Sequence, residues 1–259
     1  MRQINAIAAI AGRDLMKFLR DPLRIVSTLV FPLVFIVILG GAFAPMVGDE
    51  FDFRSFVFAG VLAQTMWQSA ALGLVSLIED RENDFSQAIF VAPISRYAIV
   101  LGKISGESLV ALAQGVAIVL VGVLLGIRLS PTQLALLVPA SIVACLFGGA
   151  FGLMIMANIR NQRTAQQIFP FLILPQFFLA GVFNRIQDLD AFLGFLSLVS
   201  PMRYAVDLVR AAFYTGRSPA EHSAAVVASP TFNLTVIGLF FALFMVVGTA
   251  MFVRREQNR

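Results

Sequence analysis

The chain lacks most of the residues that build metal and disulfide sites in soluble proteins. Its 259 residues contain one cysteine, Cys145, and one histidine, His222. A single cysteine excludes an intrachain disulfide and a cysteine-based metal site, and a single histidine excludes a histidine-rich metal site. Charged residues make up 13% of the sequence, against about 25% in an average soluble domain.

Motifs for nucleotide binding and hydrolysis are missing as well. The one Gly-Lys pair, Gly102-Lys103, is followed by isoleucine and lacks the upstream glycine of a phosphate-binding loop. The patterns Gly-x-Ser-x-Gly, His-Glu-x-x-His and Gly-x-Gly-x-x-Gly are absent. We therefore expect neither a catalytic site nor a cofactor bound by this chain.

Apolar residues dominate: they make up 59% of the chain, and 25 residues are phenylalanine. The polar surface is too small to cover a soluble domain, so lipid is the expected solvent. Six stretches are long and apolar enough to cross a bilayer core about 30 Å thick as helices. They are residues 25–45, 56–78, 99–127, 133–157, 168–183 and 232–253, and Pro170 and Pro175 interrupt the fifth. The expected fold is an all-α integral membrane protein, one domain over residues 1–259 with six transmembrane helices.

The basic residues predict the orientation of these spans. With both termini in the cytoplasm, 13 of the 19 lysines and arginines fall on the inner side, as membrane topology favours. The net charge of +4 fits a surface that faces anionic lipid, and nucleic acid is not expected as a partner. Ala42-Phe43-Ala44 resembles a cleavage site, but about two dozen residues precede the apolar run, so we expect an uncleaved first span.

Residues 1–22 are expected to form an amphipathic helix on the inner membrane surface. Apolar side chains from Ile4 to Phe18 recur on one helical face, while Arg13 and Lys17 lie opposite. A helix too polar to cross the bilayer lies along it. Either an anchoring role alone or a role in gating is compatible with this pattern.

The segment 79–97, between the second and third spans, combines a dense charge cluster with a short apolar helical stretch. Phe85, Ile89 and Phe90 can share one face, and Pro93 ends the stretch because it disfavours helix in the preceding residue. Such a segment suits docking into a groove of another protein. A solvated loop that only turns the chain is the alternative, and composition does not separate the two.

Residues 184–215 are too amphipathic for a plain external loop, and we expect two short re-entrant helices there. Ser200-Pro201 supplies a cap residue followed by proline at the first helical position. Arg203, Asp207 and Arg210 follow at helical spacing, so the aspartate is expected to bridge both arginines.

Two features inside the predicted spans bear on packing and on energy supply. Ala144, Gly148 and Gly152 repeat at every fourth residue, which favours close approach of another helix of the same chain over a subunit interface. Lys103 and Glu107 are the only ionisable residues of the spans, and their spacing allows them to pair. An ion-coupled carrier usually holds more mid-membrane charge, so we expect the energy to come from another polypeptide.

These features together resemble the type-2 ABC exporter permeases, in the branch related to daunorubicin-resistance and nodulation-factor export permeases. The resemblance covers nearly the whole chain, and it is carried by Glu82, by Phe-Ser-Gln-Ala-Ile-Phe-Val-Ala-Pro-Ile-Ser-Arg at 85–96, by Leu101-Gly102-Lys103 and by Ser-Pro-Met-Arg-Tyr at 200–204. The chain departs from many relatives at Asn83-Asp84-Phe85, where they have glycine, threonine and leucine. Because of this departure, the resemblance does not define the first and last residues of the coupling helix.

The resemblance implies a dimer of permeases in a prokaryotic inner membrane with two cytoplasmic ATPase subunits that bind ATP and magnesium. We expect a homodimer because one chain can form a two-fold interface by itself, and a heterodimer is the open alternative. It implies that a coupling helix contacts the ATPase through Asp84, Phe85, Gln87, Ile89, Phe90 and Val91. It further implies a substrate path along spans one, two and five, for which the candidates are Gln64, Trp67, Gln68, Phe171, Gln176 and Phe177. The expected function is export of a lipophilic, drug-like or lipid-linked substrate. An ion-coupled secondary transporter and a membrane assembly factor that transports nothing are the alternatives.

Overall fold

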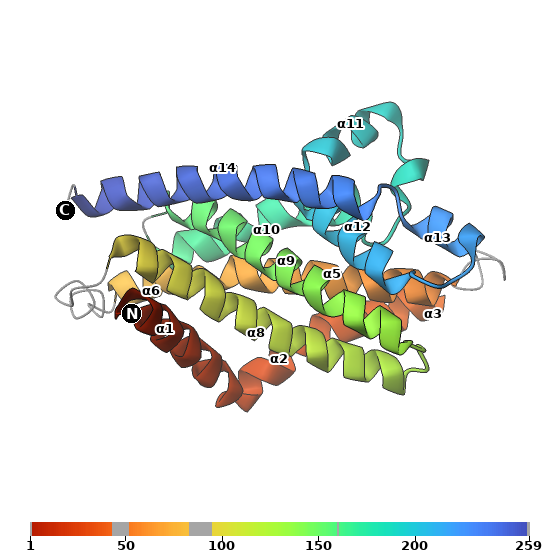
Figure 1. Ribbon diagram of the computed structural model, residues 1–259, viewed down its shortest axis with the longest axis horizontal. Helices are drawn as coiled ribbons and strands as arrows, with labels where there is room; N and C mark the ends of the chain where they lie inside the picture. The colour runs from red at the N-terminus through yellow and green to blue at the C-terminus, as the bar shows by residue number, and fades with distance from the viewer. Residues whose placement is uncertain (1, 43–51, 83–94, 160, 258–259) are drawn as a thin grey trace.

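The computed structural model describes residues 2–42, 52–82, 95–159 and 161–257, and every element in these ranges is a helix (Figure 1). The first part of the chain forms α1 (Arg2–Leu19), α2 (Pro22–Val34), η1 (Phe35–Leu39), α3 (Gly40–Ala42), α5 (Phe53–Gly73) and α6 (Ser76–Glu82). The remainder forms α8 (Arg96–Leu124), α9 (Pro131–Met156), α10 (Gln162–Leu179), η2 (Ile186–Asp188), α11 (Ala191–Val199), α12 (Pro201–Phe213), α13 (Pro219–Ala225) and α14 (Pro230–Gln257). The expected all-α fold is confirmed.

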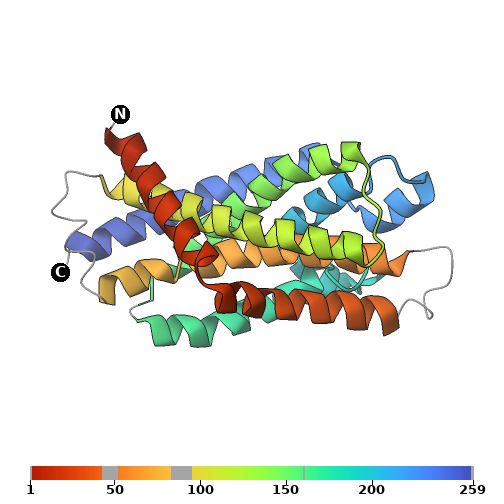
Figure 2. The same ribbon diagram turned by 90° about the horizontal axis from the view of Figure 1, so that it is seen from below.

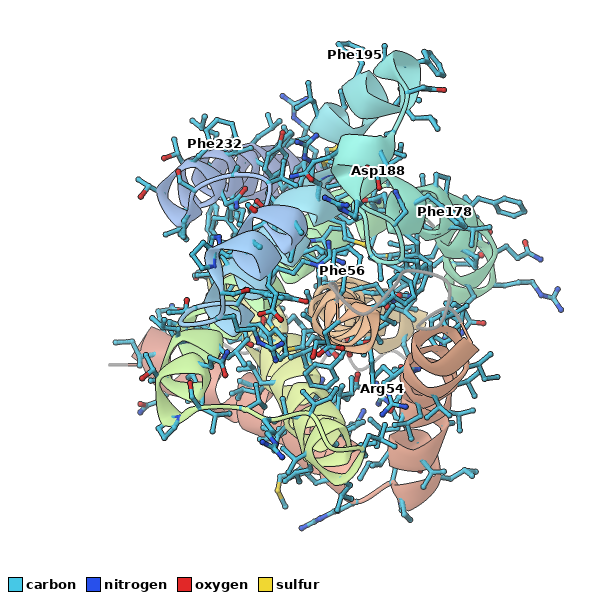
Figure 3. All side chains as sticks on the ribbon, turned by 90° about the vertical axis from the view of Figure 1, so that its right-hand side faces the viewer. Arg54, Phe56, Phe178, Asp188, Phe195 and Phe232 are labelled. Carbon is cyan, nitrogen blue, oxygen red and sulfur yellow. The ribbon has the colours of Figure 1, made fainter. Side chains whose placement is uncertain are left out.

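The long helices form an elongated bundle around α5, whose side chains from Ser55 to Trp67 are all buried. Figure 3 looks along the bundle and shows Phe56 of α5 near its centre. Helices α8, α9 and α12 pack against α5, and α14 packs on α9 and α12. Both termini lie at the same end of the bundle, as an even number of spans predicts (Figures 1 and 2).

Among the described residues, five helical segments have the length and apolar composition of a membrane span: Pro22–Leu39, Phe53–Glu79, Arg96–Leu124, Pro131–Met156 and Pro219–Arg254. The fifth predicted span corresponds to α10, whose 18 residues begin earlier than expected, at Gln162, and continue through Pro170 and Pro175. The polar residues of its first two turns make α10 less apolar than the other five. The prolines therefore lie inside one helix and do not divide it.

Close packing of α5 on α9 depends on two glycines of α9. A Cβ atom added at Gly148 would overlap the backbone carbonyl of Trp67, and one at Gly152 would overlap the carbonyl of Ala71. Ala144 on the same face is fully buried. The predicted small-residue face is confirmed as an intrachain contact, because only glycine lets the two backbones approach so closely.

Helix α1 packs along the first half of α8 and crosses it at an angle (Figure 2). Glycines make this contact possible: a Cβ at Gly102 would stand 3.0 Å from Ile10, and one at Gly106 would stand 3.1 Å from Ala11. Ala11 and Phe18 are buried as the amphipathic pattern predicts, but Asp14 is buried beside them. One buried carboxylate thus lies on the packed face of α1.

Helices α11 and α12 follow each other with a bend of 88°. Helix α12 is buried over most of its length against α5, α9 and α14, whereas Phe192, Phe195 and Val199 of α11 are exposed. Figure 1 shows α11 projecting from the bundle and α12 turning back into it. This geometry agrees with the two short re-entrant helices expected before the last span.

Candidate functional site

An apolar cavity of about 530 Å³ lies between α2, α5 and α10. Phe31 of α2, Leu72 of α5, and Phe171 and Phe177 of α10 are among its lining residues. The Phe31 and Phe177 ring centroids are 6.1 Å apart. Because Phe171 is 82% exposed, the cavity is open at α10. Aromatic and aliphatic walls of this kind bind apolar groups by removing them from water.

An amide-lined cavity of about 290 Å³ adjoins it, between α2, α5 and α8. Gln64, Gln68 and Gln114 line it together with Thr28. The Gln64 side-chain N–H donates to the side-chain oxygen Oε1 of Gln68. The side-chain oxygen Oε1 of Gln64 is buried and accepts no hydrogen bond from the described residues. A buried acceptor left unpaired costs about 1–3 kcal/mol, so this oxygen would bind a donor on a ligand or a water molecule.

A third cavity, of about 460 Å³, is polar and lies toward the end of the bundle that carries both termini. Lys103 Nζ of α8 is 3.2 Å from Asp14 Oδ2 of α1 and donates to Ser76 Oγ of α6 at 3.2 Å. Ser76 Oγ in turn donates to Glu107 Oε1 at 2.9 Å. These four buried or half-buried side chains join α1, α6 and α8 into one network.

This network corrects the expected pairing of Lys103 with Glu107. Helical spacing within α8 allowed that pair, but α1 brings a carboxylate to Lys103 and α6 brings a hydroxyl between the two residues. The Glu107 carboxyl group packs where a side chain at Gly73 would stand. The closest described partners of both side chains therefore come from other helices.

The three cavities share walls. Leu72 lines all of them, Arg24 and Gly73 line the polar and the amide cavity, and Phe31 and Gln68 line the amide and the apolar cavity. Together they form a groove bounded mainly by α2, α5 and α10, which correspond to the predicted spans one, two and five. We call it the graded groove, since its lining changes from charged to amide to apolar.

Four of the six substrate-path candidates line this groove: Gln64, Gln68, Phe171 and Phe177. Trp67 is fully buried on the opposite side of α5, where its ring centroid lies 4.8 Å from that of Phe151 of α9. Gln176 is buried, donates to the Leu172 carbonyl at 3.1 Å and accepts from the Met202 backbone N–H at 3.4 Å.

Trp67 and Gln176 thus contribute to packing and lie outside the graded groove. The sequence patterns did not single out Phe31 or Leu72, whose spans offered many equivalent apolar residues. A polar residue stands out in an apolar span and can be chosen as a candidate from the sequence, whereas one apolar residue among many cannot.

The predicted coupling residues Asp84, Phe85, Gln87, Ile89, Phe90 and Val91 lie outside the described residues, and their role stays a prediction. The described chain that follows these residues is fixed to the bundle. Ser95 caps α8, and its N–H and hydroxyl donate to Gln3 Oε1 of α1 at 3.1 and 3.2 Å. Arg96 donates to the Val253 carbonyl of α14 at 3.4 Å. Helix α8 is therefore tied at its start to both terminal helices.

The expectation that Asp207 bridges two arginines is wrong. Its carboxylate accepts from the backbone N–H groups of Val227 and Ala228 at 2.8 and 2.9 Å, and from the side chain of Asn233 at 2.8 Å. Arg203 donates to Ser197 Oγ at 3.0 Å. Asp207 connects α12 to the chain before α14, because fixed donors from that segment meet its carboxylate.

Arg210 faces the opposite way. Its guanidinium carbon lies 3.6 Å from the ring centroid of Phe56, and Nη2 donates to the Val182 carbonyl at 3.1 Å. Gly60 leaves space for this contact, since a Cβ there would stand 2.7 Å from Arg210 Nη2. The arginine attaches α12 to α5 and to the chain after α10, so Asp207 and Arg210 both hold α12 in place.

Within the described ranges, no group of three or more histidine, cysteine, aspartate and glutamate side chains is placed to hold a metal ion. The candidate functional site is therefore the graded groove, and the contacts of Asp207 and Arg210 position α12 in the bundle.

Residues 5–214 match the model of the ABC-2 type transporter family. The chain belongs to this family. It is also similar to a transport permease, ycf38, of Cyanophora paradoxa, with 24% identity over 243 residues that cover 91% of this chain and 81% of the relative. A ycf38 transport permease of Porphyra purpurea is 23% identical over 215 residues, which cover 80% of this chain and 73% of that protein.

Membership in the ABC-2 family gives the chain its general role, that of a multi-pass membrane protein and transport permease subunit. The family also implies pairing with an ABC ATPase subunit. The sequence expectations of a transmembrane permease are confirmed at this level.

Proposed function

We propose that this permease exports a lipophilic, drug-like or lipid-linked substrate across a prokaryotic inner membrane. The observation that carries the proposal is the graded groove between α2, α5 and α10. A groove with charged residues toward the termini and aromatic residues farther along can hold both the polar and the apolar part of one molecule. Gln64, Gln68, Phe171 and Phe177 are the proposed contacts.

In this proposal the energy comes from two cytoplasmic ATPase subunits that bind ATP and magnesium. Two copies of the chain form a homodimer with all termini in the cytoplasm, and the segment 84–91 contacts the ATPase. Moving a two-state gate from 1:99 to 99:1 requires about 5.5 kcal/mol of differential binding, which one docking segment per subunit can supply. The similarity to daunorubicin-resistance and nodulation-factor permeases supports this export direction.

The decisive experiment measures ATP hydrolysis by the partner ATPase in liposomes that contain the full-length chain. The test variant carries Ile89→Asp and Phe90→Asp, and the control carries Gln257→Asp and Asn258→Asp, which change the net charge equally. We expect the native chain and the control to stimulate hydrolysis and the test variant to lose this stimulation. Equal stimulation by both variants would refute the coupling role of residues 84–91.

Substrate contact is tested separately by transport of a fluorescent lipophilic substrate in the same liposomes. Gln68→Leu and Phe171→Ala change the graded groove, whereas Val116→Ala changes an exposed residue of α8 outside it. We expect the first two to change the apparent affinity for the substrate and the third to leave it unchanged. An affinity that none of the three alters would contradict a path along the groove.

The same preparation separates the two alternatives. Transport that persists without the ATPase and collapses with an uncoupler would identify an ion-coupled secondary transporter. A chain that neither transports substrate nor stimulates hydrolysis would fit an assembly factor.

A further inference from the structure

Three arginines surround a cavity of about 810 Å³ at the end of the bundle opposite both termini. Arg54 comes from the start of α5, Arg128 from the connection between α8 and α9, and Arg217 from the connection between α12 and α13. Figure 3 views the molecule from this end and labels Arg54. With both termini in the cytoplasm, as the sequence predicts, these residues lie on the outer side of the membrane, where the distribution of basic residues disfavours arginine.

Two glycine turns bring these arginines together. Gly126 has a φ of 90° and Gly216 a φ of 78°, a left-handed conformation that residues with a side chain rarely adopt. A Cβ at either position would meet no neighbouring atom, so conformation and not space requires glycine there. Each turn precedes one of the arginines by at most two residues and reverses the chain toward the cavity.

Arg217 forms the fixed wall of the cavity. Its guanidinium group is 3.6 Å from Asp52 Oδ2 and donates to Ser55 Oγ at 3.4 Å. It also lies over the rings of Phe213 and Tyr214, at 4.7 and 5.2 Å from their centroids. Asp52 therefore offsets the charge of this arginine and holds it in place.

The other two arginines, Arg54 and Arg128, form fewer or longer polar contacts with described residues than Arg217 does. Arg54 donates only at 3.5 Å, to the Leu125 carbonyl, and Arg128 is exposed and forms no ion pair with a described residue. Glu221 is the second carboxylate of the lining, so three guanidinium groups face two carboxylates. The cavity thus has an excess of positive charge among its described residues, carried by Arg54 and Arg128.

An exposed apolar surface begins next to the cavity. On α8, Leu120 is 61% exposed, Val123 52% and Leu124 84%, and the cavity lining starts at the next residue, Leu125. On α9, Leu134 and Val138 are 42% and 59% exposed, within two turns of the lining residue Gln133. Cationic side chains at the edge of an apolar helix surface lie where lipid headgroups meet acyl chains.

We propose that this cavity binds the headgroup of an anionic phospholipid. Arg54 and Arg128 donate to the phosphate oxygens, Arg217 forms the back of the site, and the acyl chains lie on the exposed surfaces of α8 and α9. Guanidinium groups suit this ligand because their paired N–H donors match the geometry of a phosphate. The site is separate from the graded groove, which lies between α2, α5 and α10.

The test measures lipid retained by the purified full-length chain, so it does not depend on the proposed export function. The chain is purified in detergent with phosphatidylglycerol or with phosphatidylcholine, and bound lipid is counted by native mass spectrometry. The site variant carries Arg54→Gln and Arg128→Gln. The control carries Arg163→Gln and Arg254→Gln, which remove two exposed arginines from the opposite end.

We expect the native chain and the control to retain phosphatidylglycerol in preference to phosphatidylcholine. Each arginine near a membrane surface contributes about fivefold to anionic lipid binding, so the site variant should bind phosphatidylglycerol about 25-fold more weakly. Added salt should weaken binding to the native chain because it screens exposed charges. This salt test remains available if the site variant does not fold.

Three results would overturn the proposal. Equal retention of phosphatidylglycerol by the site variant and the control would show that these arginines do not bind it. Equal retention of both lipids by the native chain would remove the preference for a negative charge. Displacement of the lipid by inorganic phosphate at equal concentration would show a phosphate site with no contribution from acyl chains.

Discussion

Substitution of Gly152 by alanine should loosen the contact between α5 and α9, although alanine is the better helix former. The added Cβ would overlap the carbonyl oxygen of Ala71, and a Cβ at Gly148 would overlap that of Trp67. A flexible side chain could rotate away from such a contact, but a backbone carbonyl inside a helix cannot. The two helices would have to separate, and Trp67 would lose contact with Phe151.

The expected magnitude follows from two opposing terms. Replacing a helical glycine by alanine stabilises a helix by up to about 1 kcal/mol. Overpacking a close contact costs about 1–3 kcal/mol, so a net loss of about 1–2 kcal/mol is expected for Gly152→Ala. For a chain of this size, that loss corresponds to a fall of about 2–8 °C in the unfolding midpoint.

The matched control is Gly238→Ala in α14, where an added Cβ meets no atom within 4 Å. Thermal unfolding of the three purified chains in the same detergent, followed by tryptophan fluorescence, reports on Trp67 directly, since it is the only tryptophan. Gly238→Ala should unfold at the native midpoint or slightly above it. An equal midpoint for Gly152→Ala and Gly238→Ala would refute the argument from backbone proximity.

Three further predictions concern buried charges. Asp14→Asn should destabilise the chain by up to about 3 kcal/mol because it removes the carboxylate 3.2 Å from the buried ammonium group of Lys103, and a second change, Lys103→Met, should restore most of the unfolding midpoint. Additive losses would contradict this pairing. Asp207→Asn should speed hydrogen exchange of the two backbone amides that donate to it, and unchanged exchange would contradict this role. Phe56→Leu should cost about 0.5–2 kcal/mol beyond the lost packing, measured by a double-mutant cycle with Arg210→Met, which removes the cation. A coupling energy near zero would exclude the cation–π contact.

The long apolar runs were sufficient to predict where most spans lie. Helix α8 covers Arg96–Leu124 against an expected 99–127, and α9 covers Pro131–Met156 against 133–157. Such agreement is expected because the length of an apolar run and its bounding turns are local properties of the chain. Pro131 follows the capping residue Ser130, so the start of α9 is also encoded locally.

The partners of charged side chains could not be predicted in the same way. Spacing along one helix suggested that Lys103 pairs with Glu107 and that Asp207 bridges Arg203 and Arg210. Spacing shows only which residues of the same helix are close, whereas Asp14 comes from α1 and the donors to Asp207 come from residues 227–233. A buried charge takes the best-placed donor or acceptor that any neighbouring helix offers.

By itself, the sequence determined the class of the protein, the approximate limits of most of its long helices, the amphipathic character of α1 and the need for close packing at Gly148 and Gly152. All of these follow from composition and from periodicity along one segment. Only the tertiary structure decided which face of α5 borders the graded groove, so that Gln68 lines it while Trp67 packs on α9. Side chains around a helix that is buried over most of its length have no polar face to distinguish them, and the neighbouring helices determine what each one contacts.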